Sequence, residues 1–486
     1  MQERLNELAA KIRKAYNVPS IALSVYRDGE TFFCCDGFAD TENQTLATPD
    51  TVYPIASTSK SFAATALCIL ADEGKLKLDD KIRQHFPDFA LQSEALAGEL
   101  TIRDALTHRT GLPRHDMMWM ILEETTIADV VRRLRYLPSA FPLRTRMQYQ
   151  NHMFVLASLL VEKITGMSWY AFIREKILDP LGMNSTFPLA GDYRDKGLPT
   201  EAKPYADRGD GLKRIPYLPS DHVAGAGCIS SSVRDMDKWA RLHLNKGELD
   251  GKRIFSEDMA KQMHSPQTII KAGEFMPPDF EFGEIDFLNY GMGWFVECYR
   301  GHKLVHHGGT VNGFESLVGF LPNDDLAFTV LTNLDGNMAP SALGYIICDL
   351  ALGLGEIDWG KRWLDAMNAL LGQMKQGKEA VDEKLKGATP LPRAAGDYVG
   401  TYEHPGYGKV AVEVNDGVFT VQFGPDRLEL RHLCHEQFYL SYGDGRVWLP
   451  VKFDYDMDGA INKVMILLES LTGWIEFNKE EEKQPA

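Results

Sequence analysis

The stretch Pro54-Ile-Ala-Ser-Thr-Ser-Lys-Ser-Phe62 decides how the chain is interpreted, because it joins two reactive side chains to a predicted helix. Good helix formers follow it as far as Ala71, and Gly74 can supply the positive φ of a C-cap. Ser57 is therefore expected in the first turn of a helix. Lys60 then lies one turn further along, on the same face and beside the Ser57 hydroxyl.

This pair suits acyl transfer. A serine hydroxyl becomes a good nucleophile when a base takes its proton, and a lysine can be that base when burial or nearby positive charge lowers its pKa. Free backbone N–H groups at the helix start favour the negative charge that develops in such a reaction. A Ser-x-x-Lys spacing also occurs in ordinary solvated helix starts, so this pair alone does not identify an active site.

A second polar element, Gln148-Tyr-Gln-Asn151, precedes another predicted helix. The phenol of Tyr149 can relay protons when nearby ammonium groups lower its pKa, and the amide of Asn151 can hold a substrate carbonyl. The alternative is structural: Tyr149 packs on the helix and Asn151 is its N-cap.

The third element is Leu304-Val-His-His-Gly-Gly-Thr-Val-Asn-Gly-Phe314. The glycine pair that ends at Gly309 allows the backbone to approach a ligand closely. We expect the backbone N–H of Thr310 to form an oxyanion hole with that of Ser57, and His307 to supply a donor beside it. The alternative is a glycine-rich strand with a surface histidine.

In this order, Ser-x-x-Lys, Tyr-x-Asn and His-x-Gly resemble the class C β-lactamase-like and penicillin-binding-protein-like serine hydrolases. That group includes D-alanyl-D-alanine carboxypeptidases, D-aminopeptidases and esterases. Four more segments are similar to patterns of the family: Leu106-Thr-His-Arg-Thr-Gly-Leu-Pro113, Asp179-Pro-Leu-Gly-Met183, Ala224-Gly-Ala-Gly-Cys-Ile-Ser-Ser231 and Tyr290-Gly-Met-Gly-Trp294. The resemblance implies Ser57, Lys60 and Tyr149 as catalytic residues, and Asn151, His307, Gly309 and Thr310 as substrate-binding residues.

The chain departs from the family pattern at two positions. His307-Gly-Gly309 stands where β-lactamases carry Lys-Thr-Gly, which resembles the esterases and peptidases of the group. Gln150 replaces the serine that is usual between Tyr149 and Asn151. The general base of this family is argued between the tyrosine and the lysine, so Tyr149 and Lys60 are treated as a coupled pair.

The resemblance implies a serine hydrolase that acts through an acyl-enzyme on Ser57. Its substrates are expected to be small peptides, amides or esters, with a D-residue-directed peptidase, a carboxypeptidase or an esterase as the leading activity. The alternatives are an acyltransferase or peptide cyclase, a true β-lactamase and, in a different class, a non-catalytic binding protein. No cofactor and no metal are expected, and a homo-oligomer is an open alternative.

Composition limits the partners and the compartment. The chain has 486 residues with 52 basic and 68 acidic side chains, a net charge of −16 that gives no general reason to bind nucleic acid. No apolar run approaches the roughly 20 residues of a membrane span. The N-terminus lacks a signal-peptide apolar core, which favours the cytoplasm. The seven cysteines are an odd number without metal-type spacing and are expected to be reduced.

The predicted fold class is α/β, with two domains. Residues 1–386 are expected to form a β-lactamase-like domain, an antiparallel sheet flanked by helices with an all-helical subdomain at about 76–220. Residues 387–392 are a predicted linker, 393–477 a small antiparallel β-barrel that resembles a lipocalin-like domain, and 478–486 a disordered tail. Its aromatic residues are expected to form a core rather than a ligand site: Tyr398, Tyr402, Phe419, Phe438 and Trp448.

Overall fold

The computed structural model describes residues 1–120, 125–189, 193, 201–443 and 445–480. The chain divides into two compact units, each with its own core. Unit 1 comprises Met1–Phe89, Ala95–Gly111 and Pro142–Met367. Unit 2 comprises Ala90–Glu94, Leu112–Phe141 and Asn368–Ala486.

Unit 1 is built on a nine-stranded antiparallel sheet in the order β10-β11-β12-β13-β14-β15-β1-β2-β3. Its strands are β1 (Ser20–Arg27), β2 (Glu30–Asp40), β3 (Thr45–Leu46), β10 (Thr268–Ile270), β11 (Ile285–Tyr290), β12 (Phe295–Tyr299), β13 (His302–Val311), β14 (Phe314–Leu321) and β15 (Leu326–Thr332). Strand β1 pairs with β15, so the two ends of the unit meet within one sheet. Three short pairs complete the strands: β4 (Tyr53–Pro54) with β7 (Ser230–Ser231), β5 (Tyr205–Asp207) with β6 (Leu212–Arg214), and β8 (Glu248–Leu249) with β9 (Lys252–Arg253).

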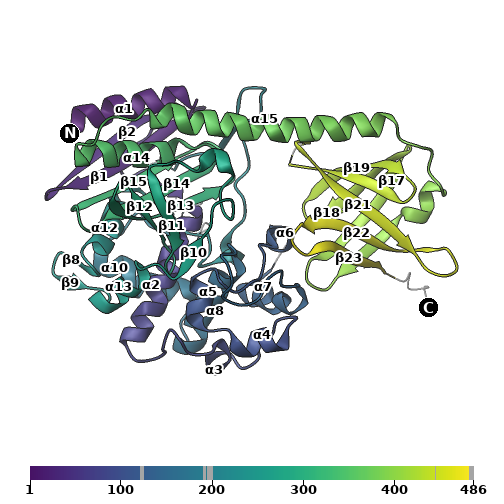
Figure 1. The fold of residues 1–486 in the computed structure, drawn as a ribbon, viewed down its shortest axis with the longest axis horizontal. Coiled ribbons are helices and arrows are strands. Elements are labelled where there is room, and N and C mark those ends of the chain that lie inside the picture. The colour runs from purple at the N-terminus through teal and green to yellow at the C-terminus, as the bar shows by residue number, and fades with distance from the viewer. Residues whose placement is uncertain (121–124, 190–192, 194–200, 444, 481–486) are drawn as a thin grey trace. The chain divides into compact units, whose positions relative to one another are not determined.

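Helices cover both faces of this sheet (Figure 1). Helices α1 (Gln2–Ala15) and α14 (Ala339–Leu352) pack on one face, and α12 (Val233–Leu244) packs on the other. Helix α2 (Ser59–Asp72) lies against α12, where the rings of Phe62 and Trp239 stack with centroids 3.8 Å apart. All residues of α2 from Ser59 to Leu70 are buried, so this helix is the centre of unit 1.

Helix α8 (His152–Thr165) is buried over most of its length. Further helices of this unit are α3 (Ile82–His85), α4 (Glu94–Glu99), α5 (Ile102–Leu106), α9 (Trp169–Ile173), α10 (Asp179–Leu181) and α13 (Glu257–Met263), of which α3, α5 and α9 contact α8. Short 3₁₀ segments are η1 (Ala56–Thr58), η4 (Asp221–Val223) and η5 (Pro278–Phe280) in unit 1, and η2 (Leu134–Tyr136) and η6 (Ala395–Tyr398) in unit 2. Segment η3 (Arg174–Leu178) is a π-helix. Gly74 has the expected positive φ of 71° just after α2, so the predicted C-cap is confirmed.

The core of unit 2 is a closed eight-stranded barrel, β16 to β23. Its strands are β16 (Gly400–His404), β17 (Gly408–Asn415), β18 (Val418–Phe423), β19 (Asp426–Cys434), β20 (Gln437–Tyr442), β21 (Val447–Tyr455), β22 (Ile461–Glu469) and β23 (Gly473–Lys479). Inside it, the Phe438 ring contacts Tyr398, Phe419 and Phe453 with centroids 5.1 to 5.6 Å apart. The predicted α/β fold class, a helix-flanked antiparallel sheet followed by a small barrel, is confirmed.

Three details differ from the sequence-based expectations. Trp448 lies half-buried outside the barrel core, because side chains alternate along β21 and Val451 and Phe453 occupy the inward positions; its Nε1 donates to Asp382 of α15 (Trp359–Lys386) at 2.8 Å. Asn478 and Lys479 belong to β23, because pairing with β16 closes the barrel. Residues 481–486 of the expected tail lie outside the described residues.

The expected helical subdomain is also divided. The segment Leu112–Phe141, which carries α6 (Asp116–Met120) and α7 (Ile127–Arg133), groups with the barrel rather than with unit 1. Nδ1 of His115 lies 2.7 Å from the hydroxyl of Tyr407. Local helix patterns do not reveal this, because they carry no information on which distant strand a helix contacts.

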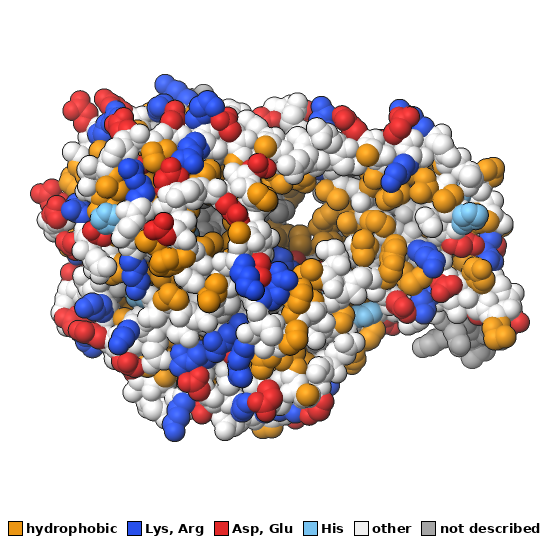
Figure 2. Space-filling model, in the orientation of Figure 1, with side chains coloured by type: hydrophobic (Ala, Val, Ile, Leu, Met, Phe, Trp, Pro, Cys, Tyr) orange, Lys and Arg blue, Asp and Glu red, His pale blue; other side chains and the backbone are white. Residues whose placement is uncertain are grey.

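Two features bear on possible partners: the distribution of surface charge and the character of the helices. Acidic and basic side chains are interspersed over the face drawn in Figure 2. Among the described residues, no helix combines the length and the apolar character needed to cross a bilayer.

Candidate active site

Ser57 lies at the start of a helix, as the sequence predicts. It occupies η1, which runs directly into α2. Ala56, the residue before it, has a φ of +46°. This left-handed conformation costs free energy in any residue with a side chain, and such strain commonly marks functional sites.

Two other serines follow Ser57 closely but are engaged within the protein. Ser59 and Ser61 are fully buried, whereas Ser57 is half-buried. The Oγ of Ser59 accepts the backbone N–H of Ile229 at 3.2 Å, and the Oγ of Ser61 accepts Nε1–H of Trp239 at 3.0 Å. Ser57 is therefore the accessible hydroxyl of the three.

Lys60 joins the first and second polar elements. Its side chain is buried, and Nζ lies 3.0 Å from Oγ of Ser57, 2.7 Å from Oδ1 of Asn151 and 2.8 Å from the carbonyl oxygen of Ala226. Ser57 and Lys60 come from the η1–α2 segment, and Asn151 immediately precedes α8. The structure thus brings together Ser57, Lys60 and Asn151.

Tyr149 adds an aromatic ring beside this group. Nζ of Lys60 lies 4.9 Å from the centroid of the Tyr149 ring, within the range of a cation–π contact. The Tyr149 ring also contacts His108 at 4.3 Å and Phe275 at 5.8 Å between centroids. Phe275 in turn contacts Phe295 of β12 at 4.9 Å. An apolar wall therefore adjoins the polar cluster.

Strand β13 passes very close to the backbone of Ser57. A Cβ atom on Gly309 would lie 2.9 Å from the backbone N of Ser57 and 2.2 Å from the carbonyl oxygen of Ile55, so only glycine fits. Ser316 of β14 fixes this approach: its Oγ donates to the Ile55 carbonyl at 2.8 Å and lies 2.9 Å from Oγ1 of Thr58. The third element thus reaches the helix start that carries Ser57.

Thr310 follows Gly309 on the same strand. Its side chain is exposed to solvent, and its Oγ1 donates to Oε2 of Glu315 at 2.6 Å. The side chain is therefore held by the neighbouring strand β14. The backbone of Thr310 belongs to the segment that Gly309 places against Ser57.

His307 is almost completely buried, with 1% of its surface exposed. Nε2 lies 3.0 Å from the hydroxyl of Tyr290, and Nδ1 lies 2.6 Å from the carbonyl oxygen of Gly308. Burial and the nearby Lys60 cation hold the pKa of His307 well below its ordinary value. One ring nitrogen of His307 was expected to donate a hydrogen bond to the oxyanion. Both ring nitrogens instead face protein groups.

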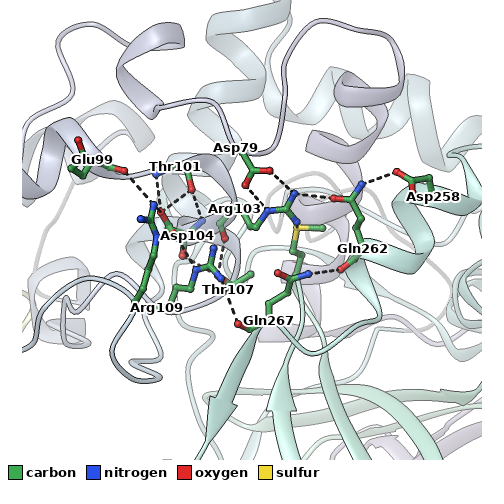
Figure 3. Close-up of polar contacts among 12 residues, drawn as sticks. Asp79, Glu99, Thr101, Arg103, Asp104, Thr107, Arg109, Asp258, Gln262 and Gln267 are labelled. Carbon is green, nitrogen blue, oxygen red and sulfur yellow. Dashed lines mark hydrogen bonds and ion pairs between the residues drawn. The ribbon is translucent and has the colours of Figure 1, made fainter.

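Asp104 anchors the segment that leads to His108 (Figure 3). Its carboxylate is fully buried, pairs with Arg109 and with Arg144 at 2.6 Å each, and accepts from Oγ1 of Thr101 at 2.7 Å. Burial alone raises the pKa of Asp104, but the hydrogen bonds of these three partners outweigh it and lower that pKa to about 2.

His108 and the second element are joined by backbone hydrogen bonds. The N–H of Gln148 donates to the carbonyl of His108 at 2.7 Å, and the N–H of Gln150 donates to Nδ1 of the same histidine at 3.1 Å. Oε1 of Gln150 accepts the N–H of Met153 at the start of α8. The glutamine that replaces the usual serine therefore caps a helix.

Sequence patterns did not single out four residues of the site: His108, Tyr290, Phe275 and Ser316. The first two lie in segments 106–113 and 290–294, whose likeness to family patterns was the available signal. Phe275 and Ser316 carry no local signal, because their roles arise from contacts with distant residues. No set of three His, Cys, Asp or Glu side chains placed to hold a metal occurs within the part of the chain that the structure describes.

Residues 5–348 match the family described as Beta-lactamase, which is more than half of the chain. The chain belongs to the Beta-lactamase family. A second match covers residues 386–483, the barrel, and is described as a domain of unknown function (DUF3471).

Two proteins similar to this Beta-lactamase family member are hydrolases by name. The unguisins hydrolase ungD' of Aspergillus campestris (strain IBT 28561) is 28% identical over 96% of this chain and 89% of its own. The D-amino acid amidase from Ochrobactrum anthropi SV3, solved with L-phenylalanine amide, is 25% identical with a TM-score of 0.60, covering 72% of this chain and 98% of its own. Family membership and these hydrolases identify the chain as an enzyme of the serine hydrolase class.

The similarity to solved structures extends in some cases along nearly the whole chain. The octameric penicillin-binding protein homologue from Pyrococcus abyssi has a TM-score of 0.63 and 22% identity, covering 98% of this chain and 99% of its own. At this identity the likeness concerns the fold alone.

Proposed function

We propose that the protein forms an acyl-enzyme on Ser57 and cleaves amide or ester bonds of small peptides, amides or esters. The observation that carries this proposal is the 3.0 Å contact between Nζ of Lys60 and Oγ of Ser57. The similarity to an unguisins hydrolase supports hydrolysis, and the similarity to a D-amino acid amidase supports amide cleavage with D-residues as the leading substrates.

The contacts of Lys60 suit both protonation states that a base must adopt. A neutral amine donates two hydrogen bonds, here to Asn151 and Ala226, and accepts one from the Ser57 hydroxyl. Once the proton has moved, the ammonium group donates to all three oxygens. The proton transfer therefore requires no reorganisation around Nζ.

In the proposed reaction, Oγ of Ser57 attacks the substrate carbonyl carbon while its proton passes to the Lys60–Tyr149 pair. The backbone N–H groups of Ser57 and Thr310 stabilise the oxyanion, and Asn151 helps to hold the substrate. The bond to the leaving group breaks as that group takes the proton. Water then attacks the Ser57 ester, the pair accepts a proton from it, and the acid product leaves as Ser57 is restored.

The surroundings of the polar cluster favour an uncharged, apolar substrate. Phe275 and Phe295 form an aromatic wall beside Tyr149, which suits an aromatic or branched side chain next to the scissile bond. His307 is neutral at pH 7, so it offers no permanent cation to a β-lactam carboxylate. We therefore expect weak nitrocefin turnover compared with esters and amides.

Labelling with a fluorophosphonate, followed by peptide mass spectrometry, tests the nucleophile. We expect one adduct, on Ser57, in the wild type and in Ser59→Ala, and none in Ser57→Ala. An adduct on Ser59 or Ser61 would contradict the assignment. A folded wild type that takes no label would favour a binding protein instead.

A substrate panel tests the reaction class. We expect turnover of p-nitrophenyl esters and of D-phenylalanine amide above L-phenylalanine amide. Adding an amine acceptor separates hydrolysis from acyl transfer, because a transferase gives a new amide product. A kcat/KM for nitrocefin above that of the best ester would favour a true β-lactamase.

Two further properties are proposed with this function. The odd number of cysteines supports a reducing compartment such as the cytoplasm, which cell fractionation tests. The similar fold of an octameric protein motivates a homo-oligomer as a hypothesis, and light scattering of the purified protein measures its size. A secreted protein or a monomer at micromolar concentration would contradict these two points.

A further inference from the structure

The two hydrogen bonds of His307 determine which ring nitrogen carries the proton. Nδ1 lies 2.6 Å from the carbonyl oxygen of Gly308, and a carbonyl oxygen can only accept, so Nδ1 carries the hydrogen. A neutral imidazole has a single N–H. Nε2 is therefore an acceptor, and the hydroxyl of Tyr290, 3.0 Å away, donates to it.

The groups around His307 favour this neutral state. Lys60 of α2 lies close enough to oppose a second positive charge, and Tyr149 contacts the ring at 6.4 Å between centroids. Phe295 of β12 covers the ring at 5.2 Å. On β13 itself, His306 alternates to the opposite face of the strand, where its Nε2 lies 3.3 Å from Oε2 of Glu297.

The ring of Tyr290 is itself held in place. It is fully buried and contacts His108 and Phe295 with centroids 4.5 and 4.8 Å away. Four rings therefore contact one another around the polar cluster: Tyr149, His108, Tyr290 and His307. The Tyr290 hydroxyl is fixed relative to His307 by this packing.

The backbone of His307 also contacts the nucleophile segment. Its carbonyl oxygen accepts from Oγ1 of Thr58, the residue after Ser57, at 3.3 Å. Two residues further along β13, Gly309 lies against the backbone N of Ser57. The orientation of His307 thus bears on the strand segment that supplies the proposed oxyanion hole.

We propose that Tyr290 is a positioning residue, whose hydroxyl holds His307 as the neutral Nδ1–H tautomer so that His307 fixes residues 308–310 of β13 beside Ser57. In this arrangement His307 acts through the strand and gives no hydrogen bond to the substrate. The proposal rests on the proposed acyl-enzyme function for its kinetic consequences, but the tautomer itself does not depend on any reaction.

Tyr290→Phe removes the donor and keeps the ring. Nε2 then lacks its partner, so the imidazole can take the other tautomer or a proton. We expect acylation of Ser57 by a fluorophosphonate at pH 7 to slow roughly tenfold, the size of one lost hydrogen bond. The loss should grow as the pH falls, because Nε2 of His307, once it lacks the Tyr290 hydroxyl, can take a proton.

The matched control is Tyr345→Phe. Tyr345 of α14 is also a buried tyrosine, and its hydroxyl donates to Oε2 of Glu297 at 3.3 Å, with His306 on that face of the sheet. This variant removes one buried hydroxyl from the same unit without touching His307. We expect it to change thermal stability but neither the labelling rate nor its pH profile.

Imidazole NMR of the full chain, labelled with ¹⁵N-histidine, reads the tautomer directly. We assign the His307 signal from its loss in His307→Gln. In the wild type we expect an Nδ1–H imidazole that does not titrate between pH 5 and 8, and in Tyr290→Phe a signal that titrates or changes tautomer. An Nε2–H tautomer in the wild type overturns the proposal even if Tyr290→Phe fails to fold.

A double-mutant cycle separates positioning from a general structural effect. If Tyr290 acts only through His307, Tyr290→Phe will not slow labelling further in the His307→Gln background. Additive losses, or a Tyr290→Phe enzyme with the wild-type rate and pH profile, overturn the proposal. A wild type that takes no label on Ser57 instead defeats the proposed function, and the NMR result still decides the tautomer.

Discussion

Both units of the protein are built on antiparallel strands, but they differ in what fills the space beside those strands. The barrel encloses its own core, where Tyr398, Phe419 and Phe438 pack ring against ring. The sheet of unit 1 is open and covered by helices, and a helix start reaches strand β13 with a buried Lys60 beside it. This barrel fills its interior with side chains, whereas the open sheet of unit 1 leaves room for an inserted polar site.

The variant with the largest expected effect removes the proposed nucleophile from unit 1 without changing the packing of that unit. Ser57→Ala should lower kcat by at least about 10⁴-fold, as when a nucleophilic serine is lost elsewhere. Its melting temperature should stay near that of the wild type, because Ser57 is only half-buried. Ester hydrolysis and a thermal melt measure both, and a small loss of activity would contradict the assignment.

Removing either member of the proposed proton relay should lower activity slightly less than removing Ser57. Lys60→Ala and Tyr149→Phe should each lower kcat/KM by about 10²- to 10⁴-fold, the range of general acid–base catalysis. If the two act as the proposed coupled pair, the double variant should lose little more than the worse single one. Losses that multiply would show that Lys60 and Tyr149 work independently.

The converse experiment removes packing from the barrel without touching the chemistry. Phe438 is buried against three aromatic rings, so Phe438→Ala should destabilise unit 2 by about 3–5 kcal/mol. Denaturant unfolding measures this change. The rate of Ser57 labelling by a small fluorophosphonate should remain that of the wild type, and a parallel loss would show that the barrel contributes to the site.

The buried carboxylate of Asp104 tests whether polar contacts stabilise unit 1 as much as aromatic packing stabilises unit 2. Asp104→Asn leaves Arg109 and Arg144 without their buried carboxylate and should cost about 3 kcal/mol. The folded-state pKa of about 2 lies below the unfolded value of about 3.9, so the unfolded state binds the proton more readily. The stabilisation that ionised Asp104 gives the folded state is complete above about pH 4 and is lost as the pH falls towards 2. Asp104→Asn should lack this pH-dependent contribution, and acid unfolding of the two proteins measures it.

The smallest expected effect concerns the segment that groups with the barrel. Tyr407→Phe removes the hydroxyl that meets Nδ1 of His115 and should cost about 1 kcal/mol. Limited proteolysis should then cut Leu112–Phe141 faster than in the wild type, with Tyr439→Phe, a half-buried barrel tyrosine, as the control. Equal cleavage rates would show that this contact does not hold the segment.

Much of the site follows from local sequence. The three-residue spacing of Ser57 and Lys60, the apolar run of α2 and the C-cap at Gly74 are all local properties, and helical geometry alone places the two side chains on one face. The alternating strands and turns after residue 393 predicted a small barrel for the same reason. The order of the three polar elements indicated the family, which the match over residues 5–348 confirms.

The tertiary structure decided the contacts between elements far apart in the chain. It left Ser57 the most exposed of three nearby serines, placed Asn151 and Ala226 on Nζ of Lys60, and directed Tyr290 to Nε2 of His307. It also assigned Leu112–Phe141 to the barrel and Trp448 to its outside. These outcomes depend on strand register, on helix packing and on the left-handed φ of Ala56, which side-chain periodicity does not encode.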